Sequence, residues 1–202
     1  MQPFTQVTGI AAALPAANLD TDVIMPKQFL KGIDRAGLAA GVFHHLRAQP
    51  GFILDQPAWR EARFLVVGPN FGCGSSREHA VWGLAQLGIR AIIGPSFGGI
   101  FFDNCRNNGL LALVLPQPEV DALMALAADP QRNRMTIDLP AQLILCPGAP
   151  DLPFTLDPQT KDSLVRGLDA VAATLEAADA IRRFEAVHHQ SNPWLAREVT
   201  HV

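Results

Sequence analysis

The chain contains few cysteines, and they are widely spaced. They are Cys73, Cys105 and Cys146, and no two of them form a Cys-x-x-Cys pair. An odd, dispersed set does not indicate a disulfide framework, and it is typical of proteins in a reducing compartment. Three cysteines are also too few for the four ligands of an iron–sulfur cluster. Cysteine usage therefore favours a cytoplasmic protein without disulfides.

The sequence also lacks a basic excess and a long apolar run. Its 202 residues carry 16 Lys and Arg against 19 Asp and Glu, a formal net charge of −3. Nucleic acids and anionic membrane surfaces both attract basic faces, so neither is an expected partner. No apolar stretch approaches the ~20 residues that cross a bilayer, and the first residues do not resemble a secretory signal. We expect a soluble, cytoplasmic protein.

Several common catalytic and metal-binding motifs are missing. The chain has no G-x-x-x-x-G-K-[ST], no G-x-S-x-G and no His-Glu-x-x-His. The sequence therefore does not favour a P-loop nucleotide site, a hydrolase elbow or a zincin helix. Four of the six histidines occur as adjacent pairs, whose side chains point apart on regular structure, so zinc is not favoured either. We predict no metal ligands in this chain.

The middle of the chain does contain a clear alternation of strands and helices. The apolar runs at 64–68 and 90–94 are typical of strands buried on both faces, and the amphipathic stretch 77–87 between them predicts a helix. A helix over 100–102, capped by Ser96, and a strand at 110–115 continue the pattern, which implies parallel pairing. The other expected strands are 4–14, 135–139, 142–146 and 154–156, and the other expected helices are 27–31, 118–128 and a long run at 160–187 that divides near Thr174 or Asp179.

Residues 70–79 concentrate more chemistry than any other stretch. They read Asn-Phe-Gly-Cys-Gly-Ser-Ser-Arg-Glu-His, a glycine-rich loop that leads into a helix. The first N–H groups of such a helix are unpaired and attract carboxylate or phosphate groups. Arg77 adds a planar fork suited to a carboxylate. Ser75 could donate to the anion, or act as a base if its alkoxide is stabilised. The segment predicts an anion at the start of the helix.

Two polar clusters each allow a second interpretation. Residues 75–78 also form a Ser-x-x-Glu capping box, in which a serine would serve the helix start instead of a ligand. Asp20 and Asp22 could bind a hard cation, or their side chains could close the loop by capping. The sequence leaves both alternatives open.

Residues 70–79 and three further stretches resemble one known family. The stretches are 18–31, 95–104 with 107–111, and 167–175 with 179–181, and they follow the family's order over nearly the whole chain. The chain resembles the small subunits of 3-isopropylmalate dehydratase, in the aconitase superfamily. This resemblance implies an α/β fold: an aconitase-type swivel domain with three β/β/α layers, a partly parallel sheet and C-terminal helices. It implies one domain over 1–202, with a core at about 1–157 and a helical extension at 158–202.

The resemblance also implies an activity. The family's enzyme isomerises 2-isopropylmalate to 3-isopropylmalate in leucine biosynthesis, by dehydration and rehydration. A large subunit would carry a [4Fe–4S] cluster, and the small subunit would be active only in a heterodimer with it, binding no cofactor itself. The alternatives are the small subunit of a sibling hydro-lyase acting on citraconate/2-methylmalate, homoaconitate or dimethylmalate, or a non-catalytic anion-binding module.

Specific residues follow from the same resemblance. Ser75 matches the superfamily's catalytic base, and Ser76 and Arg77 match neighbours that bind a substrate carboxylate. In the family's substrate-recognition loop, Ile33 would offer an apolar contact and Arg35 a carboxylate partner. Arg35 could equally be a simple surface residue.

Overall fold

The structure, a computed structural model, describes residues 1–30, 35–75 and 77–196. The chain divides after Gly167 into two compact units, Met1–Gly167 and Leu168–Val202. The single domain over 1–202 with a core at about 1–157 stays a prediction. Within the described ranges, no helix is both long and apolar enough to cross a membrane.

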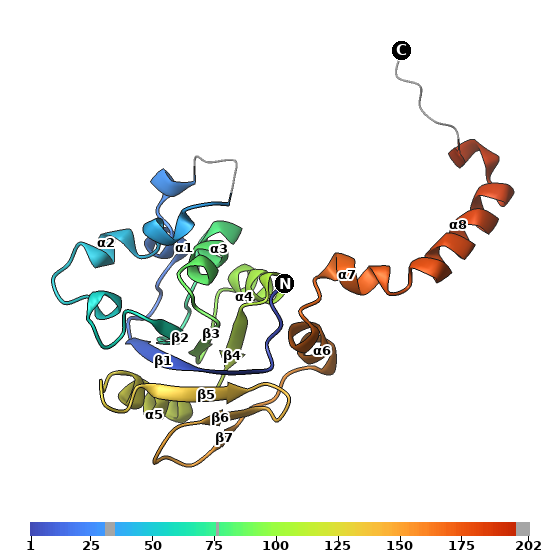
Figure 1. Cartoon of the computed structure of the whole chain (residues 1–202). Helices are drawn as coiled ribbons and strands as arrows, with labels where there is room; N and C mark the ends of the chain where they lie inside the picture. Colours follow the sequence, from blue (N-terminus) through green and yellow to red (C-terminus); the bar gives the residue numbers. More distant parts are fainter. Residues whose placement is uncertain (31–34, 76, 197–202) are drawn as a thin grey trace. The chain divides into compact units, whose positions relative to one another are not determined.

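The first unit is built on one mixed sheet of seven strands in the order β4-β3-β2-β1-β5-β6-β7 (Figure 1). Neighbours among the first four strands are parallel, and the rest are antiparallel, which confirms the partly parallel sheet. The strands are β1 Gln6–Leu14, β2 Ala62–Val67, β3 Ala91–Gly94, β4 Leu111–Val114, β5 Arg134–Asp138, β6 Leu143–Leu145 and β7 Leu152–Pro153. The last strand lies just before the predicted stretch 154–156.

Both faces of the parallel half are buried, which explains its continuous apolar runs. In β2, Phe64 and Val66 belong to one core cluster, while Leu65 and Val67 belong to the other, and all four are fully buried. Side chains alternate between the faces of a strand, so a strand covered on both sides needs an apolar residue at every position.

Helices cover the two faces. The predicted helices are confirmed as α3 Glu78–Gln86 and α4 Gly99–Asn108, whose buried side chains join one core cluster, and α5 Gln117–Ala127, which joins the other. The expected cap of α4 is wrong. Gly98 is its N-cap, and the Ser96 hydroxyl oxygen instead accepts from the Asn70 N–H at 2.8 Å.

Short helical turns fill the connection between β1 and β2. They are α1 Thr21–Ile24, the 3₁₀ turns η1 Lys27–Phe29 and η2 Leu38–Gly41, α2 His44–Arg47 and η3 Ile53–Asp55. Met25, Val42 and Phe43 from this region are fully buried in the core cluster that contains α3. The connection is therefore anchored against the helix that follows the glycine-rich loop.

The predicted helical run at 160–187 consists of three helices. α6 Pro158–Arg166 ends at Gly167, a break that the sequence pattern missed, and it belongs to the first unit. The second unit contains α7 Ala170–Leu175, α8 Ala178–Ser191 and the turn η4 Pro193–Ala196. The predicted division near Thr174 or Asp179 is confirmed. No residue of α7 or α8 is buried.

Candidate active site

Three polar loops meet at one edge of the sheet. Strands β1, β2 and β3 are parallel neighbours, so their carboxyl ends lie at the same edge. A parallel bridge joins Asp20, after β1, to Cys73, after β2, and a second joins Phe71 to Phe97, after β3. In open α/β sheets, ligands bind outside the carboxyl ends of the strands. This edge is the candidate site.

Ser75 lies exposed on the loop between β2 and α3. It lines a hollow of about 190 Å³ together with Cys73 and the start of α4, including Ile100. Gly72 has a φ of 72°, and a Cβ at this position would overlap the ring of Phe101. Only glycine accepts both conditions. Gly72 therefore lets the loop lie against α4 and present Ser75 at the mouth of the hollow.

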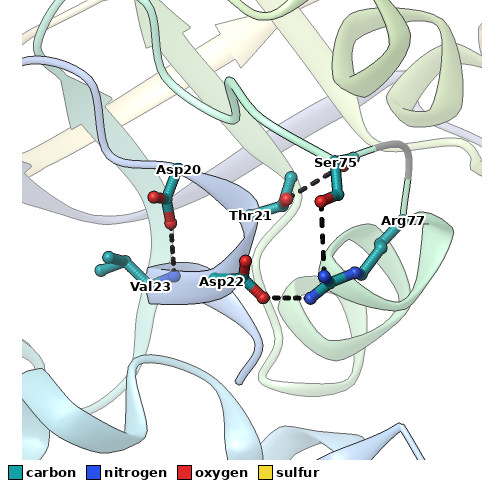
Figure 2. Close-up of polar contacts among 6 residues, drawn as sticks. All are labelled: Asp20, Thr21, Asp22, Val23, Ser75 and Arg77. Atoms are coloured by element: carbon teal, nitrogen blue, oxygen red, sulfur yellow. Dashed lines mark hydrogen bonds and ion pairs between the residues drawn. The ribbon is translucent and has the colours of Figure 1, made fainter. Parts of the chain in front are cut away.

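Arg77 links the loop that carries Ser75 to the loop after β1. One guanidinium nitrogen forms an ion pair with Asp22, and another donates to the Ser75 hydroxyl oxygen at 3.3 Å (Figure 2). The Arg77 side chain is 17% exposed. A cationic donor stabilises an alkoxide more than the neutral alcohol. The contact therefore favours removal of the Ser75 proton.

Thr21 fixes the backbone beneath this pair. Its hydroxyl donates to the Ser75 carbonyl oxygen at 2.9 Å, as Figure 2 shows, and its N–H donates to the Cys73 carbonyl oxygen, also at 2.9 Å. Thr21 is 2% exposed. Two hydrogen bonds from this buried residue to a loop more than 50 residues away in the sequence therefore hold the serine loop in place.

The capping-box alternative is wrong for Ser75. α3 begins at Glu78, Arg77 is its N-cap, and no side chain among the described residues caps the helix. The Glu78 carboxylate accepts from Asn108 Nδ2 at 2.7 Å instead of returning to the loop. Among the described residues, no side chain therefore competes with an anion for the first N–H groups of α3.

Of the two interpretations of Asp20, cation binding or loop capping, the structure supports capping. Its carboxylate accepts from the Val23 N–H at 2.7 Å and so caps α1 (Figure 2). Asp22 is the partner of Arg77. Within residues 1–30, 35–75 and 77–196, no three His, Cys, Asp or Glu side chains are placed to hold a metal ion.

The predicted site residues are only partly brought together. Ser75 and Arg77 are in contact. The Arg35 guanidinium lies over the ring of Trp82 in α3, with its Cζ 4.0 Å from the ring centroid, and its carbonyl oxygen accepts from Gln86. Ser76 and Ile33 lie outside the described residues. The substrate-binding roles of Ser76, Arg77, Ile33 and Arg35 stay predictions.

The cysteines occupy two kinds of environment. Cys73 is half-buried and lines the hollow beside Ser75. Cys105 and Cys146 are buried free thiols, and burial raises the pKa of both, well above the ordinary value for Cys105. The three thiols do not form a common metal-binding group in the part of the chain that the structure describes.

Comparison with known proteins identifies the class of this fold. The family model described as the aconitase C-terminal domain matches residues 1–118, which contain β1 to β4 and the loops of the site. The crystal structure of 3-isopropylmalate dehydratase from Methanocaldococcus jannaschii has a TM-score of 0.67 to this chain at 26% identity, and the match covers 90% of this chain and 99% of that chain. The chain thus has the aconitase C-terminal-domain fold, and the predicted fold class is confirmed.

Relatives of similar length narrow this class. The 3-isopropylmalate dehydratase small subunit 1 of Mannheimia succiniciproducens is 52% identical, over 96% of this chain and 99% of its own length. The 3-isopropylmalate dehydratase small subunit of Ruegeria sp. is 49% identical, over 96% of this chain and 100% of its own length. A second family model, the C-terminal domain of this small subunit, matches residues 171–198. The chain belongs to the 3-isopropylmalate dehydratase small subunits, and the resemblance seen in the sequence is confirmed.

The sequence pointed to residues 20–22 without revealing what they do. It singled out Asp20 and Asp22 as a polar cluster, but not the ion pair between Asp22 and Arg77 or the hydrogen bond from Thr21 to Ser75. The available signal was the position of both loops directly after apolar strands, because the ends of neighbouring parallel strands meet.

Proposed function

We propose that this chain is the small subunit of a hydro-lyase that converts 2-isopropylmalate into 3-isopropylmalate by dehydration and rehydration, in leucine biosynthesis. Family membership supports the reaction. The observation that carries the assignment of the site is the hydrogen bond from Arg77 to Ser75 at the mouth of the hollow. It joins a candidate base to a cationic group suited to the carboxylates of such a substrate.

In this proposal Ser75 removes the proton from the carbon next to a substrate carboxylate. A serine is a weak base, and the neighbouring guanidinium and the positive end of the α3 dipole would both stabilise its alkoxide. Arg77 then has two tasks, since it supports the base and offers its fork to the carboxylate. Ser76 would add a hydroxyl donor on the same loop.

The proposal also includes a partner. Relatives named small subunits imply a large subunit, and we assign the [4Fe–4S] cluster to it. The described residues of this chain do not offer a ligand set that fits a cluster. When bound to the partner, the cluster would supply Lewis-acid chemistry at the substrate hydroxyl. The pair would act in the cytoplasm.

The test is the activity of the reconstituted pair. Ser75→Ala should lower kcat by about 10²- to 10⁴-fold, the usual contribution of a general base, while co-purification with the large subunit is retained. Ser163→Ala, in α6, serves as the matched control and should leave kcat unchanged. The small subunit alone should show no turnover. Near-normal kcat for Ser75→Ala would exclude this serine as the base.

A further inference from the structure

A second polar hollow lies at the other end of the strands that lead to Ser75. It has a volume of about 520 Å³ and is lined by β1, the start of β2, the end of α3 and the start of β5. Three arginines line it: Arg60, Arg63 and Arg134. β2 has six residues at roughly 3.3 Å each, so the hollow lies about 20 Å from the edge that carries Ser75. It is separate from the candidate active site.

The sheet brings these arginines together across β1. Arg63 is in β2 and Arg134 is in β5, and β1 lies between these two strands. Neighbouring strands are about 4.8 Å apart, so the two backbones are about 10 Å apart, within the combined reach of two arginine side chains. Gly9 of β1 forms part of the floor. A Cβ at Gly9 would lie 2.7 Å from Arg63 Cβ and Cγ, so this glycine makes room for the Arg63 stem.

A break in the strand register directs Arg63. Ile10 pairs with Ala62 and Ala11 pairs with Phe64, so Arg63 is the extra residue of a β-bulge. Bulges turn a side chain out of the regular alternation, and they are frequent beside functional sites.

The guanidinium groups of the hollow have no partner within the described part of the chain. Among the described residues, no hydrogen bond or ion pair engages the side chains of Arg60, Arg63 or Arg134. The negative groups present are the Glu61 carboxylate and the carbonyl end of α3. Three cations and one carboxylate leave a local charge of +2, whereas the whole chain carries −3.

Arg63 also lies beside a fourth arginine, Arg90, which does not line the hollow. The Arg90 N–H donates to the Arg63 carbonyl oxygen at 2.7 Å, which brings the two residues side by side. Burial, and then the charge of Arg63, lower the pKa of Arg90. A concave surface that accumulates one sign of charge attracts ions of the opposite sign.

We propose that this hollow binds a small anion that carries one or more phosphate groups. Guanidinium forks pair with phosphate oxygens in a bidentate manner, and three forks around one concave site suit a compact, multiply charged oxyanion. Two sources share this chemistry, free inorganic phosphate or pyrophosphate and phosphorylated metabolites. This site goes beyond the proposed function, because the isomerised substrate has carboxylates and no phosphate.

The test is calorimetric titration of the full chain with inorganic phosphate, pyrophosphate and glycerol phosphate, at ionic strength held constant with chloride. We expect one site per chain, with pyrophosphate binding most tightly. Arg63→Gln and Arg134→Gln, on different strands, should each weaken binding at least tenfold while circular dichroism stays unchanged. Arg132→Gln is the matched control, since Arg132 is exposed nearby but does not line the hollow.

The relative affinities for the three anions, and the loss of affinity in each variant, decide the outcome. Affinity for glycerol phosphate equal to that for free phosphate would indicate a phosphorylated metabolite as ligand, and a preference for free phosphate or pyrophosphate would indicate the inorganic ions. The proposal is overturned by equal losses in Arg132→Gln and Arg63→Gln, because the effect would then be general charge. Binding abolished by Arg77→Lys alone would place the anion at the candidate active site, which also overturns it.

Discussion

Arg77 has two partners before any substrate arrives. Asp22 holds one guanidinium nitrogen, and Ser75 accepts from another. A side chain that is already fixed loses little rotamer freedom when it binds a carboxylate, so more of the interaction energy remains for binding. Asp22 is therefore a positioning residue for Arg77. The ion pair is partly buried, since Arg77 is 17% exposed and Asp22 is 45% exposed.

Arg77→Lys should impair the reconstituted enzyme in both kinetic constants. An ammonium group can pair with Asp22 or with the substrate, but it cannot act as a fork toward Ser75 as well. We expect KM to rise about tenfold, which is ~1.4 kcal/mol, together with a lower kcat.

Asp22→Asn is the matched variant for this prediction. It keeps the shape of Asp22 and removes its charge, so the guanidinium is held less firmly, and we expect KM to rise less than in Arg77→Lys. Steady-state kinetics with 2-isopropylmalate is the measurement. Unchanged KM and kcat in Arg77→Lys would rule out both tasks of the guanidinium.

At the scale of single residues, the sequence predicted the site residues on the loop after β2 but not their partners on the loop after β1. Ser75 and Arg77 share a glycine-rich segment before a helix, and such a contiguous pattern can be recognised without knowledge of the tertiary fold. Asp22 is 55 residues from Arg77, and their contact depends on the pairing of β1 with β2. Arg35 shows the same limit, because its position over Trp82 depends on how the connection folds back on α3.

Among the elements, α6 has a cap that depends on pH. Hydrogen bonding from the Thr160 side chain, and then from the Thr160 N–H at 2.9 Å, lowers the pKa of the Asp157 carboxyl. A carboxyl whose folded pKa lies below its unfolded value stabilises the fold at pH above the unfolded value. That stabilisation is lost as the pH falls through the folded pKa.

The wild-type chain should therefore lose more stability in acid than Asp157→Asn, whose amide oxygen caps at every pH. The measurement is the Tm of both chains between pH 6 and pH 3. We expect the wild type to have the higher Tm at pH 6 and this advantage to shrink below pH 4. Parallel Tm curves for the two chains would contradict the assigned role.

The elements themselves could be predicted where most of their residues are buried. β2, β3 and β4 each contribute side chains to both core clusters, and Arg63 and Val114 are their exposed positions, so their apolar runs are nearly continuous. Ser96 was assigned to the wrong task, because a hydroxyl near a helix start resembles a cap until its tertiary partner, the Asn70 N–H, is known. β7 was displaced because Phe154 is buried beyond the end of the paired segment.

For the whole molecule, the division after Gly167 leads to a prediction about stability. α7 and α8 contain no buried residue, so a chain that ends at Gly167 keeps the core of the first unit. Its denaturant midpoint should match that of the full chain within error. Leu164→Ala is the control, because Leu164 is 2% exposed and its truncation should cost about 2–5 kcal/mol. A large loss of stability in the shortened chain would show that the second unit supports the first.

The position of β1 has a consequence for synthesis. β1 is made first but lies between β2 and β5, and β5 ends at Asp138. The 124 residues between Leu14 and Asp138 (138 − 14) take about 6–25 s to translate at 5–20 residues per second. During that time one edge of an apolar strand stays open, and open edges recruit other chains. Production of this protein therefore depends on how well the nascent chain is shielded on the ribosome.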